Sequence, residues 1–125
     1  MKYTLLCVAA FLLVGGLAVA QHKHADKGPN GGQMQDVAGL HAELLTSGNT
    51  ITINVFDESG KPIPTKGFSG SARVVSGAER ETVTLAPAGD SALKGNTAKP
   101  IGPAAAITVT LKTAAGKSGQ AKFAK

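Results

Sequence analysis

Short runs in which every second residue is apolar, separated by clusters of glycine, proline and asparagine, are the feature that most constrains this 125-residue chain. In the range 51–56, Ile, Ile and Val alternate with Thr, Asn and Phe, and the range 106–112 repeats the pattern with Ile, Val and Leu. A period of two places the apolar side chains on one face of a β-strand. The chain contains 16 Gly and 6 Pro, which favour tight turns between such strands.

The alternation predicts about seven short strands at regular spacing and no convincing helix. An all-β fold follows, and we expect an immunoglobulin-like antiparallel β-sandwich. A small barrel is the alternative architecture. The predicted strands cover residues 40–45, 51–56, 71–75, 81–85, 91–94, 106–112 and 119–123.

The first twenty residues have the features of a secretory signal peptide. Lys2 precedes an apolar run over residues 4–17, and Ala18-Val19-Ala20 is the small-x-small pattern that signal peptidase recognises. The apolar run is short for a membrane-spanning helix, although an uncleaved N-terminal anchor is the alternative. We therefore predict a signal peptide over 1–20 and a periplasmic or secreted protein. Cleavage would remove Cys7, the single cysteine of the chain.

After the signal peptide, the composition divides the chain into two parts. Residues 21–38 are polar and end in turn-forming sequence, so we expect a flexible, His-containing arm and a Gly-rich turn there. Residues 39–125 contain the alternating runs and are predicted to form the β-sandwich domain. The net charge is +5, but no cluster of Lys and Arg is interleaved with aromatic residues, so nucleic acid is not an expected partner.

The sequence contains no set of residues that predicts catalysis. All 3 histidines lie within residues 22–41, no Gly-rich phosphate loop precedes a helix, and no Ser-His-Asp arrangement is readable. The carboxylates fall in turns or on polar strand faces, where nothing would tune them for acid–base work. We therefore expect a protein that is not an enzyme.

The histidines instead suggest a metal site. His41 and Glu43 are two residues apart on a predicted strand, so both side chains should point to one face and could converge on one ion. His22 and His24 could join them if the arm folds back. Thiol-free imidazole ligation suits Zn(II), Cu(II) or Ni(II), and a thioether from Met34 would favour Cu(I). The competing interpretation is a solvated His-x-Glu pair and an unstructured arm.

Four motifs give the sequence a resemblance to a known family. Gly28-Pro29-Asn30-Gly31-Gly32-Gln33 is followed by His41-Ala42-Glu43-Leu44, then by Val55-Phe56-Asp57 and Gly60-Lys61-Pro62. This pattern resembles a small periplasmic β-sandwich module, the N-terminal domain of heavy-metal efflux adaptors of the membrane-fusion type, and its stand-alone secreted relatives. Asn30 stands where the family pattern often has His, which removes one potential ligand.

Two functions follow as expectations. The first is a non-enzymatic, periplasmic or secreted accessory protein that binds copper or zinc in metal handling or efflux. Its implied partner is an envelope metal-efflux or metal-delivery protein. The second is a metal-independent envelope protein–protein interaction module, which would use sheet edges and loops of the β-sandwich. Sensitivity of partner capture to a chelator distinguishes the two.

Overall fold

The computed structural model describes residues 27–124, and these form an all-β structure without helices. The prediction of an all-β fold is confirmed. Every strand pairing is antiparallel. The eight strands are β1 (Gln33–Val37), β2 (Leu40–Ser47), β3 (Thr50–Phe56), β4 (Ser69–Ser76), β5 (Glu79–Ala88), β6 (Ala92–Asn96), β7 (Ala106–Lys112) and β8 (Ser118–Ala124).

The core is made of the side chains that the alternation had placed on one face of each strand. In β3 and β7 every second residue is buried, and the intervening residues are partly exposed. Phe123 is the largest fully buried side chain, and it packs among Ile, Val, Leu and Ala. Burial of this apolar surface is the main favourable contribution to folding, because each methylene removed from water contributes roughly 0.8 kcal/mol.

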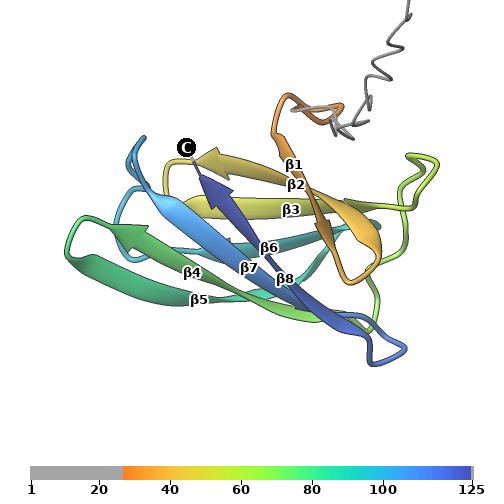
Figure 1. The fold of residues 1–125 in the computed structure, drawn as a ribbon. Coiled ribbons are helices and arrows are strands. Elements are labelled where there is room, and N and C mark those ends of the chain that lie inside the picture. Colours follow the sequence, from red (N-terminus) through yellow and green to blue (C-terminus); the bar gives the residue numbers. More distant parts are fainter. Residues whose placement is uncertain (1–26, 125) are drawn as a thin grey trace, which may run out of the picture.

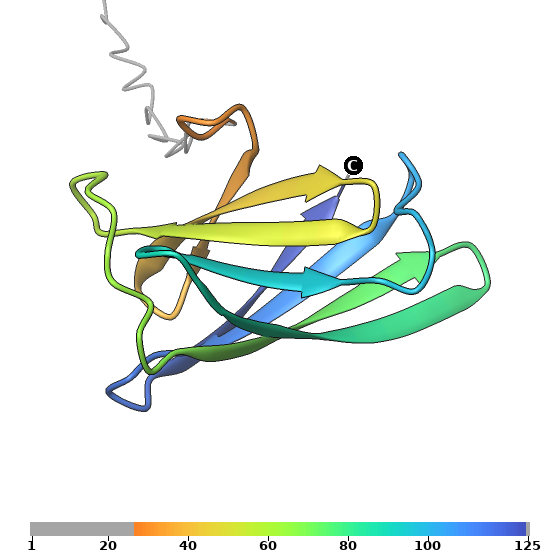
Figure 2. The same cartoon turned by 180° about the vertical axis from the view of Figure 1, so that it is seen from behind.

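The strands lie in the order β1-β2-β3-β6-β5-β4-β7-β8 within one continuous sheet. Five of the pairs, β1–β2, β2–β3, β4–β5, β5–β6 and β7–β8, join consecutive strands, but the β3–β6 and β4–β7 pairs join strands that are distant in sequence. Figures 1 and 2 show β7 and β8 on one side of the molecule and β2, β3 and β6 on the other. The sheet therefore folds over on itself around the core.

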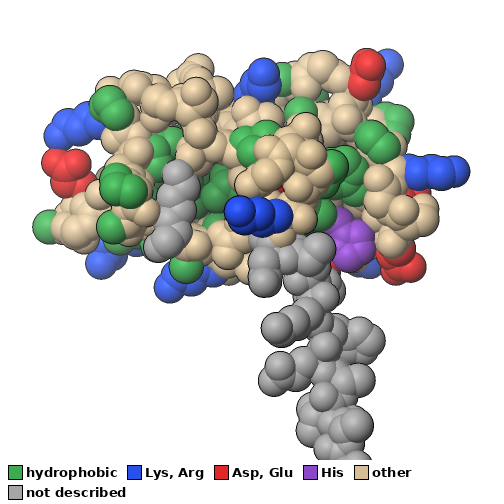
Figure 3. Space-filling model, turned by 90° about the horizontal axis from the view of Figure 1, so that it is seen from above, with side chains coloured by type: hydrophobic (Ala, Val, Ile, Leu, Met, Phe, Trp, Pro, Cys, Tyr) green, Lys and Arg blue, Asp and Glu red, His purple; other side chains and the backbone are tan. Residues whose placement is uncertain are grey.

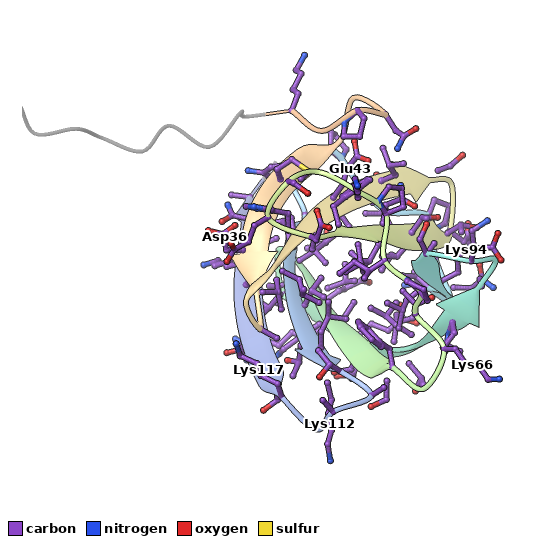
Figure 4. The ribbon with its side chains drawn as sticks, turned by 90° about the vertical axis from the view of Figure 1, so that its right-hand side faces the viewer. Asp36, Glu43, Lys66, Lys94, Lys112 and Lys117 are labelled. Carbon is purple, nitrogen blue, oxygen red and sulfur yellow. The ribbon has the colours of Figure 1, made fainter. Side chains whose placement is uncertain are left out.

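The architecture is closer to a barrel than to a sandwich of separate sheets. β5 connects the strands on the two sides of the molecule, because its residues 79–85 pair with β4 and its residues 86–88 pair with β6. The sheet nearly closes where β8 approaches the β1–β2 turn, and a Cβ on Gly119 would lie only 2.9 Å from the Cα of Ala38. The end-on view in Figure 4 shows the resulting ring of strands.

All seven predicted strands are present, with shifted ends, and the eighth lies outside the range where we expected strands. β1 falls within residues 21–38, which we had expected to be an irregular arm and turn. Its sequence, QMQDV, is largely polar, and it becomes a strand because it pairs along β2 at the edge of the sheet. Within residues 27–124, no helix is long and apolar enough to cross a membrane. The predicted signal peptide lies outside the described residues.

Candidate functional site

The pairing of β1 with β2 brings the predicted site residues next to one another. Met34 lies directly opposite Glu43, and Asp36 lies directly opposite His41. Because the residues of each strand alternate between its two faces, these four side chains share the outer face of the sheet. The other face of β2 carries Ala42 and Leu44 into the core. The prediction that His41 and Glu43 share one face is therefore consistent with the register.

Glu43 is fully buried although it lies on the outer face of β2. The loop that precedes β1 covers its carboxylate, as Figure 4 shows. The backbone N–H groups of Asn30 and Gly32 donate to Oε2 at 2.8 and 3.0 Å. The side-chain amides of Asn30 and Asn54 donate to Oε1 at 2.8 and 3.3 Å. The carboxylate thus joins the loop to β3 across β2.

These contacts also determine the ionisation of Glu43. Desolvation by burial raises the pKa of the carboxyl group, but hydrogen bonds from Asn30, Gly32 and Asn54 outweigh it and hold the pKa below its ordinary value of 4.5. The physical reason is that all four donors interact more favourably with the charged than with the neutral form. Glu43 is therefore a buried anion at neutral pH, and its oxygens are used to hold the loop.

Gly28 allows the loop to lie so close to β2. A Cβ at this position would overlap Oε2 of Glu43 and would lie 2.6 Å from the sulfur of Met34. The loop closes on itself as well, because the N–H of Gly28 donates to the carbonyl of Gly32 at 2.6 Å. Gly28 and Gly32 are thus required by the close approach of the loop to β2, because a Cβ on Gly32 would lie 2.8 Å from Cγ of Glu43.

His41 lies in a different environment, two residues away on the same strand. Its Nδ1 is 2.7 Å from Oδ1 of Asp36, and 28% of the side chain is exposed. Figure 3 shows a histidine side chain, in purple, at the molecular surface. A carboxylate at Nδ1 fixes the orientation of the ring and, in the neutral ring, places the proton on Nδ1 and the lone pair on Nε2.

His41 and Met34 line the same surface hollow, of about 290 Å³. Side chains from β1 and β2 form one wall, and Phe56 at the end of β3 with the turn that follows it forms the other. The residues that line the hollow are Pro29, Met34, His41, Phe56, Glu58, Ser59 and Gly60. A thioether and an imidazole are therefore brought to one partly exposed site by adjacent strands.

The structure divides the five predicted ligands into three groups. Met34 and His41 lie at one hollow. Glu43 is buried under the loop with its oxygens already bonded, so it does not fit the ligand role that we expected. His22 and His24 lie outside the described residues. Among residues 27–124, no group of three or more His, Cys, Asp or Glu side chains is placed to hold a metal ion.

The partners of His41 and Glu43, which are Asp36 and Asn54, were not predicted from the sequence. Asp36 is opposite His41 only because β1 pairs with β2, and β1 had not been predicted. Asn54 reaches Glu43 because it is the directly opposite residue on β3. The hairpin over residues 40–56 was predicted, and its register could have identified the Asn54 contact.

Comparison of the chain with family models, with curated proteins and with solved structures gives no match.

Proposed function

We propose that this chain is a periplasmic or secreted, non-enzymatic accessory protein that binds a copper ion, as Cu(I), through Met34 and His41. The observation that supports the proposal is that both side chains line one hollow at the protein surface. The copper ion is the cargo of the protein, which would hold it transiently in metal handling or efflux.

The donor types favour Cu(I) over Zn(II). A thioether is a soft ligand that selects Cu(I), whereas zinc sites are built from imidazole, thiolate and carboxylate. The carboxylate that we had expected to be a ligand, that of Glu43, is engaged by Asn30, Gly32 and Asn54. The remaining ligands would come from His22 and His24, a few residues before the loop that borders the hollow.

Asp36 would act as a positioning residue for the imidazole. Histidines that bind metals usually donate their second ring N–H to a carboxylate or carbonyl, which orients the ring and raises its basicity. The contact of 2.7 Å between Asp36 and His41 has this arrangement.

The arrangement of the family motifs supports the same proposal. Pro29, His41, Phe56 and Gly60 come from four separate motifs of the resemblance to efflux adaptors, and all four line the hollow. Segments that are spread over the range 28–62 therefore meet at one place in the fold. An envelope metal-efflux or metal-delivery protein is the partner that this resemblance implies.

The proposal is tested by anaerobic titration of Cu(I) against a chromogenic competitor, with calorimetric titration of Zn(II) and Cu(II) in parallel. We expect Cu(I) to bind far more tightly than Zn(II), and both Met34→Leu and His41→Ala to weaken Cu(I) binding at least tenfold. Met34→Leu keeps the size and apolar character of the side chain and removes only the sulfur.

Glu58→Gln is the matched control, because this exposed residue lines the same hollow without carrying a soft donor. It should leave Cu(I) affinity unchanged. Affinity no better than millimolar, or an affinity that neither Met34→Leu nor His41→Ala changes, would contradict the proposal. Chelator-insensitive capture of a specific envelope protein would then favour the metal-independent interaction module.

A further inference from the structure

The outer face of β4, β5, β7 and β8 carries cationic side chains and no acidic side chain. Arg73 on β4 lies opposite Thr82 of β5 and Thr108 of β7, and Thr108 lies opposite Lys122 of β8. One row across four strands therefore reads Thr, Arg, Thr, Lys. Figure 1 shows β4, β7 and β8 side by side on one side of the molecule.

The rows on either side continue the same chemistry. The next row places Thr84, Ser71, Thr110 and Gln120 in register, and Gln120 donates to the hydroxyl of Thr110 at 3.3 Å. Lys112 and Arg80 lie in the flanking rows. We call this surface the cationic face. Its outward positions are Ser69, Ser71, Arg73, Val75, Arg80, Thr82, Thr84, Ala86, Ala106, Thr108, Thr110, Lys112, Ser118, Gln120, Lys122 and Ala124.

None of these outward positions is acidic. On β5, Glu79 and Glu81 alternate with the outward positions Arg80 and Thr82. At one end of the barrel, Glu79 accepts a hydrogen bond from Lys99, and Glu81 accepts one from the N–H of Ala98. The other acidic residues of the described range lie on β1 and β2 or in turns, namely Asp36, Glu43, Asp57, Glu58 and Asp90. Arg73, Lys112 and Lys122 are therefore separated from every described carboxylate by the order of the strands and by the face on which each side chain lies. Arg80 is the exception, because it lies between Glu79 and Glu81 and lines one hollow with them.

The spacing of the cations fits an extended anionic surface better than a single small anion. Arg73 and Lys122 are two strands apart, which separates their backbones by about 10 Å. Lys112 is four residues from Thr108 along β7, a distance of about 13 Å. Figure 4 shows Lys112 pointing away from the interior of the ring. The face also lacks an aromatic side chain on which a base or a sugar would stack.

We propose that the cationic face docks the protein reversibly on an anionic phospholipid bilayer. The four cations Arg73, Arg80, Lys112 and Lys122 would lie near lipid phosphates, and the Ser and Thr hydroxyls would donate hydrogen bonds to them. Each Lys or Arg near such a surface contributes roughly 1 kcal/mol. The attachment is electrostatic, since the face exposes only small apolar side chains, and salt should therefore reverse it.

The test is co-sedimentation of the purified chain with vesicles, after its mass has established whether residues 1–20 are present. One set of vesicles is pure phosphatidylcholine and the other contains phosphatidylglycerol. We expect binding only to the second set, and loss of binding at 0.5 M NaCl. Arg73→Gln combined with Lys122→Gln removes two cations from one row and should weaken binding about 30-fold.

The matched control removes the same charge elsewhere. Lys61 and Lys66 lie in the segment that joins β3 to β4, outside the four strands of the cationic face, and both are exposed. Their double change to Gln should alter binding less than threefold. Circular dichroism checks that both variants are folded. Equal weakening by the two double variants would show that net charge alone is responsible, and failure of the wild-type chain to bind anionic vesicles at low salt would overturn the proposal.

Discussion

Replacing Glu43 by Gln tests the interpretation that this carboxylate holds the loop of residues 28–32 onto the barrel. Gln has almost the same shape, but one of its two terminal groups is a donor instead of an acceptor. In the folded protein each carboxylate oxygen accepts two hydrogen bonds. In one orientation of the amide, its NH2 group would face the backbone N–H groups of Asn30 and Gly32. In the other orientation, the side-chain amides of Asn30 and Asn54 would both have to turn over to accept from it, and the charge of the carboxylate would still be lost.

The expected loss in the free energy of unfolding follows from those contacts. A hydrogen bond to a charged group contributes about 1.5–3 kcal/mol, and a buried donor left without a partner costs about 1–3 kcal/mol. The loop lies at the surface and can move to rehydrate part of the site, so we expect a net loss of about 2–4 kcal/mol. For a domain of this size, that loss lowers the Tm by roughly 10–25 °C.

The assay is thermal and urea unfolding followed by circular dichroism. Glu58→Gln is the control, because it makes the same chemical change at an exposed position in the turn after β3. It should alter the free energy of unfolding by less than about 0.5 kcal/mol. Glu43→Gln should shift the unfolding midpoint without a change in the urea m-value, which would indicate that the fold itself is retained.

The pH dependence gives an independent check. The folded-state pKa of Glu43 lies below its ordinary value of 4.5, so the carboxylate stabilises the folded state at pH values above the unfolded-state pKa. This contribution is lost as the pH falls through 4.5 towards the folded-state pKa. The stability difference between wild type and Glu43→Gln should therefore shrink on acidification. Equal stability at neutral pH, or a difference that does not change with pH, would refute the reasoning.

Two further substitutions test the packing. Gly28→Ala should destabilise the protein by about 1–3 kcal/mol, because the added methyl group would overlap the Glu43 carboxylate. Gly102→Ala is the control, since the nearest contact of its added methyl group would be an ordinary 3.7 Å. Equal unfolding midpoints for the two variants would contradict the close approach of Gly28 to Glu43. Val109→Asp should unfold the domain by placing an unpaired charge in the core, whereas Thr110→Asp on the outer face should be tolerated. Similar circular dichroism spectra for these last two variants would mean that the register of β7 is wrong.

The sequence by itself determined seven of the eight strands and their inward faces. The alternation in residues 51–56 and 106–112 needs no distant partner to be read, because the period of a strand is a local property of the backbone. The same parity placed His41 and Glu43 on one face of β2. Gly48 and Asn49 likewise marked the hairpin turn, in which Gly48 is the residue with a positive φ, of 58°.

Only the tertiary structure decided which parts of those faces are covered. β1 is a strand because it pairs with β2, and its own sequence carries little alternation. His41 and Glu43 lie on the same face of β2, but the loop of residues 28–32 buries Glu43, whereas His41 at the hollow is partly exposed. The two side chains therefore have different roles. The order of β3-β6-β5-β4-β7-β8 likewise assembled the cationic face. The alternation within a strand sets which of its side chains point inward. Which loop covers a strand, and which strands lie beside it, depends on contacts between segments distant in sequence, and the local pattern does not specify these contacts.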